Sequence, residues 1–153
     1  MLLPLLLIIQ IVPAGEEPVA PYVQANANAG AKPFTGQAMW TAFHGRDGVA
    51  RVVDDFVIRN QADPRIGDIF KGQDMIRLRR TLREQFCYIL NGGCDYTGRS
   101  MKDAHRDVGL QTADMGALVE NLQAAMRKEG IAFSAQNRFL AKLAPMKRDV
   151  VVR

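Results

Sequence analysis

Few side chains in this sequence could carry out chemistry, and the two histidines and two cysteines are foremost among them. The chain has no GxSxG, P-loop, GxGxxG or HExxH motif, and no grouping of histidine, cysteine and carboxylate suggests acyl transfer. Cys87 and Cys94 lack the CxxC spacing and the second pair that are typical of zinc sites. His105 stands apart, because it ends a short segment between a glycine-containing loop and Gly109. A lone histidine is more often a surface or core residue than a ligand, but a neutral imidazole that faces an apolar slot can bind iron.

The other candidates have simpler readings. His44 lies beside a predicted helix boundary, so we expect a surface or capping residue there. Cys87 and Cys94 are seven residues apart and could form a disulfide if the chain is exported to an oxidising compartment. A disulfide that closes so short a loop stabilises the folded protein by about 2 kcal/mol at best. If the chain stays in the cytosol, we expect two free thiols.

Hydrophobic periodicity predicts an all-α fold with no strand. Apolar side chains recur at helical spacing, and glycine, proline and capping residues mark where the helices begin and end. The predicted segments are 47–60, a turn from Asp63 to Phe70, 75–90, Ser100 to His105, a helix capped by Thr112 and ended by Gly130, and a last helix capped by Ser134 and ended by Pro145.

The first 38 residues are predicted to lie outside the folded domain. Residues 1–14 are almost wholly apolar and end in a small-residue pattern typical of signal-peptide cleavage, although no lysine or arginine precedes them. We expect a signal-like segment and export to a periplasm or beyond; the alternative is a helix packed on the core of a cytoplasmic protein. Residues 15–38, rich in proline, alanine, asparagine and glycine, are predicted to be a flexible linker, and 39–153 to form one domain.

The sequence around His105 resembles the group I truncated haemoglobins. The Gly-Gly pair, the Tyr-Thr-Gly-Arg run and the histidine follow one another at that family's spacing, and other segments agree in order over about 40–150. The segments that carry the resemblance are Val52-Val53-Asp54-Asp55-Phe56, Ala62-Asp63-Pro64-Arg65, Ile69-Phe70, Ile89-Leu90-Asn91-Gly92-Gly93, Tyr96-Thr97-Gly98-Arg99, Met101-Lys102, His105 and Leu143-Ala144-Pro145-Met146. The resemblance implies the two-over-two helical sandwich of a truncated globin, and haem b whose iron is bound by His105.

The sequence departs from the family pattern at polar positions. His44-Gly45 stands where the family commonly has Gly-Gly, and Val57 follows Phe56 where a tyrosine typically donates a hydrogen bond to oxygen. Leu78 and Leu82 occupy positions that often carry glutamine, which leaves Gln85 as the nearest amide, with Tyr88 a further candidate donor. A donor stabilises haem-held oxygen by about 1–3 kcal/mol. We therefore expect fast oxygen release, with carbon monoxide penalised less.

The resemblance and the helical phase together define a predicted haem site. Its residues are Phe56, Val57, Phe70, Leu78, Arg79, Leu82, Phe86, Met101, His105, Met115 and Val119, with Arg79 the first candidate to contact a propionate.

The predicted function is reversible binding of oxygen, carbon monoxide or nitric oxide by a monomer or weak dimer that is served by an unidentified reductase. An enzymatic alternative is nitric-oxide dioxygenation. A third hypothesis is a basic helical module that uses the arginines of 75–90 to bind nucleic acid or anionic lipid. We favour a solvated helix face, and no nucleic-acid partner, because the net charge is only +4.

Overall fold

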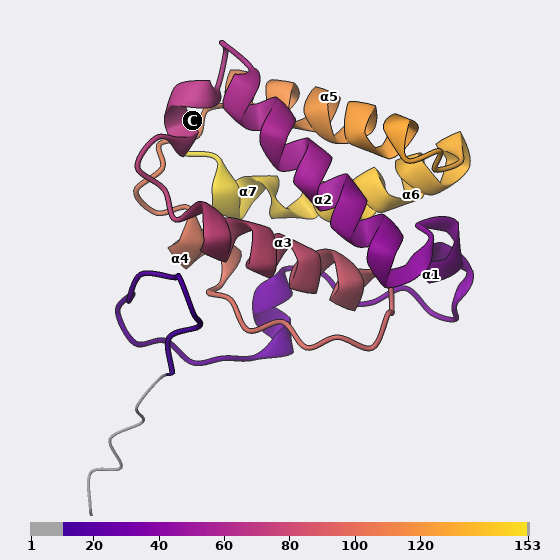
Figure 1. Cartoon of the computed structure of the whole chain (residues 1–153), viewed down its shortest axis with the longest axis horizontal. Helices are drawn as coiled ribbons and strands as arrows, with labels where there is room; N and C mark the ends of the chain where they lie inside the picture. The colour runs from indigo at the N-terminus through magenta and orange to yellow at the C-terminus, as the bar shows by residue number, and fades with distance from the viewer. Residues whose placement is uncertain (1–10, 153) are drawn as a thin grey trace, which may run out of the picture.

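The computed structural model describes residues 11–152, and over that range the chain is helical without strands (Figure 1). The all-α prediction is confirmed. The predicted signal-like segment 1–14 falls mostly on residues 1–10, which lie outside the described residues. The elements in chain order, with η for a 3-10 helix, are η1 (Asn26–Ala29), α1 (Ala38–Ala42), α2 (Gly45–Ala62), η2 (Gly67–Phe70), α3 (Met75–Ile89), α4 (Met101–Ala104), α5 (Thr112–Lys128), α6 (Phe133–Leu143), η3 (Ala144–Met146) and α7 (Lys147–Val150).

Two pairs of helices form the body of the molecule. The helix α2 packs against both α3 and α5, and α5 packs against α6, as Figure 1 shows. Their shared core contains an edge-to-face aromatic cluster in which the ring of Phe139 lies 5.0 Å from Phe43 and 4.8 Å from Phe86. This arrangement is the predicted two-over-two sandwich. Within residues 11–152, none of the helices combines the length and apolar character needed to cross a bilayer.

The helix α3 begins and ends through specific backbone contacts. At its start, the Asp74 carboxylate accepts a hydrogen bond from the backbone N–H of Arg77 at 2.9 Å. At its end, Asn91 adopts a left-handed φ of 64°, and the N–H groups of Asn91 and Gly92 donate to carbonyls of the last turn. These two bonds form a Schellman motif. The predicted end of the helix is confirmed, with asparagine rather than glycine in the left-handed position.

Two predicted caps are wrong. Thr112 is the first residue of α5, not its cap, because Gln111 takes the extended capping conformation and its N–H donates to Asp114 Oδ2 at 2.9 Å. Ser134 lies inside α6, which begins at Phe133 after an extended Ala132 with no side-chain cap. Thr112 lies one position beyond the capping residue of its helix, and Ser134 lies two positions beyond.

The segment 15–38 is not a linker separate from the domain. The side chain of Glu16 is only 1% exposed, Ala29 is fully buried, and the N–H of Phe34 donates to the carbonyl of Ile89 at 2.8 Å. The prediction failed because this segment is anchored mainly by polar and backbone contacts, which an apolar periodicity cannot reveal. In Figure 1 the segment runs beneath α3 and along the loop that leads to α4.

A disulfide joins Cys87 near the end of α3 to Cys94 in the following loop, with 5.7 Å between the Cα atoms. Cys87 is buried in the core, whereas Cys94 is partly exposed. The bond therefore ties the loop that precedes α4 to the helix that packs on α2.

We expect the variant Cys94→Ser to lower the free energy of unfolding by about 2 kcal/mol, because a short cross-link restricts the unfolded chain modestly. Urea unfolding with and without reductant measures the change. Reductant should lower the stability of the wild type and leave Cys94→Ser unaffected. Equal stability of the oxidised wild type and the variant would contradict the expectation.

Candidate functional site

The predicted site residues come from elements that meet at one end of the molecule. In Figure 1 the C-terminal end of α2, the N-terminal ends of α3 and α5, and α4 lie together on the left. The short α4 packs against α7. Ser100 caps α4, since its hydroxyl accepts a hydrogen bond from the N–H of Asp103 at 3.2 Å. The helix lasts one turn and delivers His105 at its C-terminal end.

His105 is held through one of its two ring nitrogens. Its Nδ1 lies 2.7 Å from the carbonyl oxygen of Met101. A carbonyl can only accept a hydrogen bond, so Nδ1 must carry the proton and Nε2 keeps its lone pair. None of the side chains or backbone groups of residues 11–152 pairs with Nε2. This orientation is the one that metal-binding histidines use, with the second nitrogen bonded to a backbone carbonyl.

The electrostatic environment favours the neutral form of His105. Burial is the main cause that lowers the pKa of the imidazole below its ordinary value, and the nearby Arg99 guanidinium lowers this pKa further. The hydrogen bond to Met101 acts in the opposite direction. A neutral imidazole is the form that binds a metal.

Apolar side chains around this end of the fold are left partly exposed. Such side chains are what a slot for a flat apolar cofactor needs, because the cofactor covers the remaining surface. Among the predicted site residues, the partly exposed ones are Phe70, Leu78, Leu82, His105, Met115 and Val119. Three further partly exposed apolar side chains that are not among the residues of the predicted haem site are Ile69, Met75 and Val108.

The remaining apolar residues of the predicted site are buried in the protein. Phe56 and Val57 lie in the core on α2, with Val57 only 1% exposed. Phe86 packs its ring on Phe139, so it belongs to the centre of the sandwich. Met101 is also buried, and the contact it makes with His105 is through its carbonyl oxygen.

Gln85 is not available as a donor to a ligand. Its side chain is buried, and its amide nitrogen donates to the carbonyl of Ala29 at 2.8 Å. The same nitrogen lies 3.3 Å from the sulfur of Met101. The hypothesis that Gln85 could replace the missing polar group is wrong, because the N-terminal segment occupies its amide.

The loop before α4 has a rigid local structure. The hydroxyl of Tyr96 donates to the carbonyl of Arg99 at 2.9 Å, and a Cβ on Gly98 would lie 2.3 Å from that hydroxyl. Only glycine fits there. Thr97 is held by the Glu84 carboxylate at 2.8 Å. These contacts explain why the run Tyr96 to Arg99 and its distance from His105 are specific features of the sequence.

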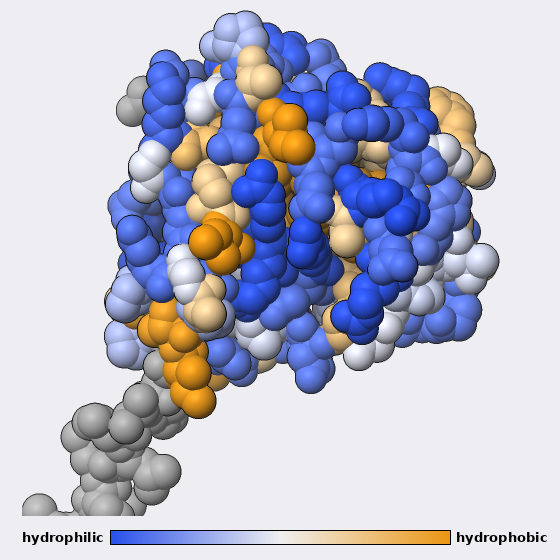
Figure 2. All heavy atoms as spheres, viewed as in Figure 1, coloured by the Kyte–Doolittle hydropathy of each residue, from blue (hydrophilic) through white to orange (hydrophobic). Residues whose placement is uncertain are grey.

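The arginines of α3 lie beside carboxylates. Both Arg79 and Arg83 approach Asp54 of α2, at 3.9 and 2.6 Å. The face of the molecule drawn in Figure 2 carries mainly hydrophilic side chains, with apolar ones scattered among them. Arg80 pairs with Glu84 at 3.1 Å. The hypothesis of a basic binding face loses its support, because these positive charges are neutralised in place. Arg79 is drawn toward α2, which weakens its candidacy for a propionate.

Arg99 was missed by the sequence analysis as a charged site residue. It is close enough to His105 to affect the pKa of the imidazole, and it forms no ion pair with any residue in the range 11–152. Within the same range no group of three or more His, Cys, Asp or Glu residues could hold a bare metal ion.

The other histidine, His44, is exposed, with its Nδ1 3.0 Å from Glu129 Oε1 and a left-handed φ of 62°. The prediction of a surface residue there is confirmed.

Residues 38–152 match the family model described as bacterial-like globin. A group 1 truncated haemoglobin from Synechocystis sp. is 30% identical over 113 residues, which cover 70% of this chain and 91% of that protein. Another from Mycolicibacterium paratuberculosis is 28% identical over 106 residues, covering 69% of this chain and 78% of that protein. The chain therefore belongs to the bacterial-like globin family, and its resemblance to the group 1 truncated haemoglobins is confirmed.

Solved structures agree on the fold. The truncated haemoglobin of Tetrahymena pyriformis in its Fe(III) form is similar with a TM-score of 0.71 and 23% identity, covering 75% of this chain and 98% of that one. A 2/2 haemoglobin from Synechococcus sp. in the cyanomet state, with covalently attached haem, gives a TM-score of 0.69 and 22% identity over 75% of this chain and 98% of that one. Haem b is the cofactor of this family, and the neutral imidazole and apolar lining described above fit it.

Proposed function

We propose that this chain binds a diatomic gas reversibly at a haem whose iron is ligated by His105 Nε2. The observation that carries the proposal is the geometry of this imidazole, which has Nδ1 on the Met101 carbonyl and Nε2 without a protein partner in residues 11–152. Haem iron supplies, when bound, the coordination position that takes up the gas. The chain holds and orients the ring, keeps the histidine neutral and excludes water with apolar side chains.

Arg99 would bind a propionate of the haem. A guanidinium can bind a carboxylate in a bidentate manner, and Arg99 has no competing carboxylate in residues 11–152. Its place in the loop between α3 and α4, close to His105, makes it a better candidate than Arg79, which lies 3.9 Å from Asp54.

The side of the slot opposite His105 would be lined by Val57, Leu78 and Leu82. None of these three side chains has a hydrogen-bond donor, and Gln85 is bound to Ala29. A polar ligand such as oxygen therefore gains no stabilising bond there, whereas carbon monoxide loses little. This supports rapid oxygen exchange rather than storage.

We further propose that the protein works in an oxidising compartment. The disulfide between Cys87 and Cys94 is stable outside the cytosol, where thiols are not kept reduced. The apolar residues 1–14 suit a leader, and the first buried anchor of the packed segment is Glu16, just beyond that stretch. Removal of the leader would leave the packed segment whole.

The mass of the protein purified from its native host tests this proposal. We expect a mature chain that begins at Gly15 and is lighter by two hydrogens than its reduced form, because the disulfide is intact. A chain that starts at Met1 with two free thiols would contradict export.

For iron ligation, we expect His105→Gly to lose the carbon monoxide-shifted Soret band of the ferrous wild type, because the side chain that binds the iron is gone. Added imidazole should restore the band by occupying the vacated space. The matched control is His44→Gly, which replaces the other histidine at a left-handed φ that suits glycine and should leave the spectrum unchanged. A normal spectrum for His105→Gly without imidazole would refute the proposal.

For the distal side, we expect Val57→Tyr to slow oxygen dissociation by about tenfold, because a phenolic donor adds a hydrogen bond to the ligand. Carbon monoxide dissociation should change far less. Ile58→Tyr places the same side chain one position along α2, where the residue is 57% exposed, and should leave both rates unchanged. Stopped-flow ligand replacement measures them, and slow oxygen release by the wild type would show that another donor reaches the ligand.

A further inference from the structure

We propose that residues 16–30, here called the proximal strap, position α4 and thereby control how His105 presents its imidazole to the iron. The strap precedes the part of the chain that matches the globin family, which begins at residue 38. The inference rests on the proposed haem function, because its effect is exerted on the iron ligand. It makes the strap a positioning element that contacts neither haem nor gas.

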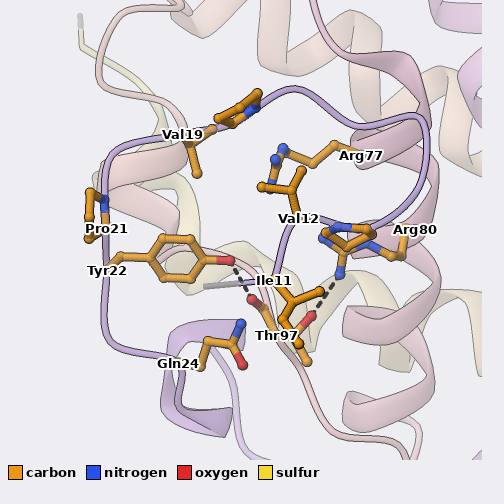
Figure 3. Close-up of a pocket in the computed structure, with 11 residues that line it drawn as sticks. Ile11, Val12, Val19, Pro21, Tyr22, Gln24, Arg77, Arg80 and Thr97 are labelled. Atoms are coloured by element: carbon orange, nitrogen blue, oxygen red, sulfur yellow. Dashed lines mark hydrogen bonds between the residues drawn. The ribbon is translucent and has the colours of Figure 1, made fainter. Parts of the chain in front are cut away.

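The strap forms hydrogen bonds to successive residues of the loop that leads to α4. The hydroxyl of Tyr22 donates to the carbonyl of Thr97 at 2.6 Å, as Figure 3 shows. The Asn26 side chain bonds twice, accepting from the N–H of Tyr96 at 2.8 Å and donating to Asp95 Oδ1 at 3.1 Å. The strap thus provides partners for loop groups that have no helix or strand of their own to satisfy them.

The start of the strap is fixed by a buried charge. The Glu16 carboxylate is 1% exposed and accepts from Arg80 Nε at 2.6 Å, with Arg77 Nη1 at 3.5 Å. Arg80 also donates to Thr97 Oγ1 at 2.6 Å, and Figure 3 shows Tyr22 and Arg80 both directed toward Thr97. A buried carboxylate needs such partners, so these ion pairs anchor the start of the strap to α3.

The end of the strap contacts the helix that carries the histidine. The Ala29 carbonyl accepts from Gln85, whose amide lies 3.3 Å from the sulfur of Met101. Gly30 approaches so closely that a Cβ on it would lie 2.8 Å from the sulfur of Met146 and 3.0 Å from Cγ of Met101. The Met101 carbonyl is bonded to His105 Nδ1. The strap therefore contacts the residue whose carbonyl orients the imidazole.

This placement has a chemical consequence. The bond from Nδ1 to a carbonyl sets the ring orientation and strengthens the basicity of the other nitrogen. A strap that holds Met101 in place keeps that bond short, whereas a loosened strap lets α4 move and weakens it. The iron–histidine bond should then weaken as well. The rate at which the gas dissociates from the iron should change with it.

The test compares the double variant Tyr22→Phe/Asn26→Ala with the control Val23→Ala, whose side chain is 82% exposed on the same strap. In the haem-free protein, we expect the amide of Tyr96 in the double variant to exchange at least about fivefold faster, because its acceptor is gone. In the haem-loaded ferrous protein, we expect the iron–histidine stretching frequency in the resonance Raman spectrum to fall. The control should match the wild type in both measurements.

The outcomes separate this inference from the proposed function. Unchanged exchange in the loop, or an unchanged iron–histidine frequency in a folded double variant, would overturn the role of the strap. A wild type with no iron–histidine band would instead refute the proposed function. The exchange rate of the Tyr96 amide in the haem-free protein would still report on the strap. If the double variant fails to fold, Asn26→Ala alone supplies the same readouts, since it removes the acceptor of the Tyr96 N–H.

Discussion

The hydrogen bond between His105 Nδ1 and the Met101 carbonyl is the interaction on which the functional reading of this molecule depends. It fixes the tautomer, leaves Nε2 with its lone pair and spans one turn of a helix that is only four residues long. A helix of that length has little stability of its own. The imidazole can therefore hold its position only if the surrounding structure holds α4.

That support comes from three directions. On one side, the disulfide and the turn from Tyr96 to Arg99 restrict the position of the loop that leads to α4. On another, α7 packs against α4. The third support is the proximal strap, which reaches the loop through polar side chains and reaches Met101 through Gly30. A short helix in a globin fold thus depends on contacts from distant parts of the chain.

The other face of the site is defined by what it lacks. Val57, Leu78 and Leu82 offer dispersion and exclude water, but none can donate a hydrogen bond. The nearest amide, on Gln85, serves the strap instead. The same residue that could have tuned the ligand therefore belongs to the structure that holds the histidine in place.

Much of the fold followed from the sequence, because α2, α3 and α5 bury apolar stripes at helical spacing. The run from Tyr96 to Arg99 and its distance from His105 revealed the site, since a chain that must fit Tyr96 against Gly98 has few alternatives. The strap was not predictable, because Glu16 and Asn26 look like solvated linker residues until their partners, 64 and 70 residues away, are known. The role of Gln85 was hidden for the same reason, as its acceptor is a backbone carbonyl in that segment.

Crystallography of the haem-loaded ferric protein at the iron absorption edge would locate the metal without any assumption about the cofactor site. The structure predicts one anomalous peak within coordinating distance of His105 Nε2, with the Met101 carbonyl still bonded to Nδ1 on the opposite side of the ring. A peak beside His44, or one that no histidine nitrogen approaches, would contradict it.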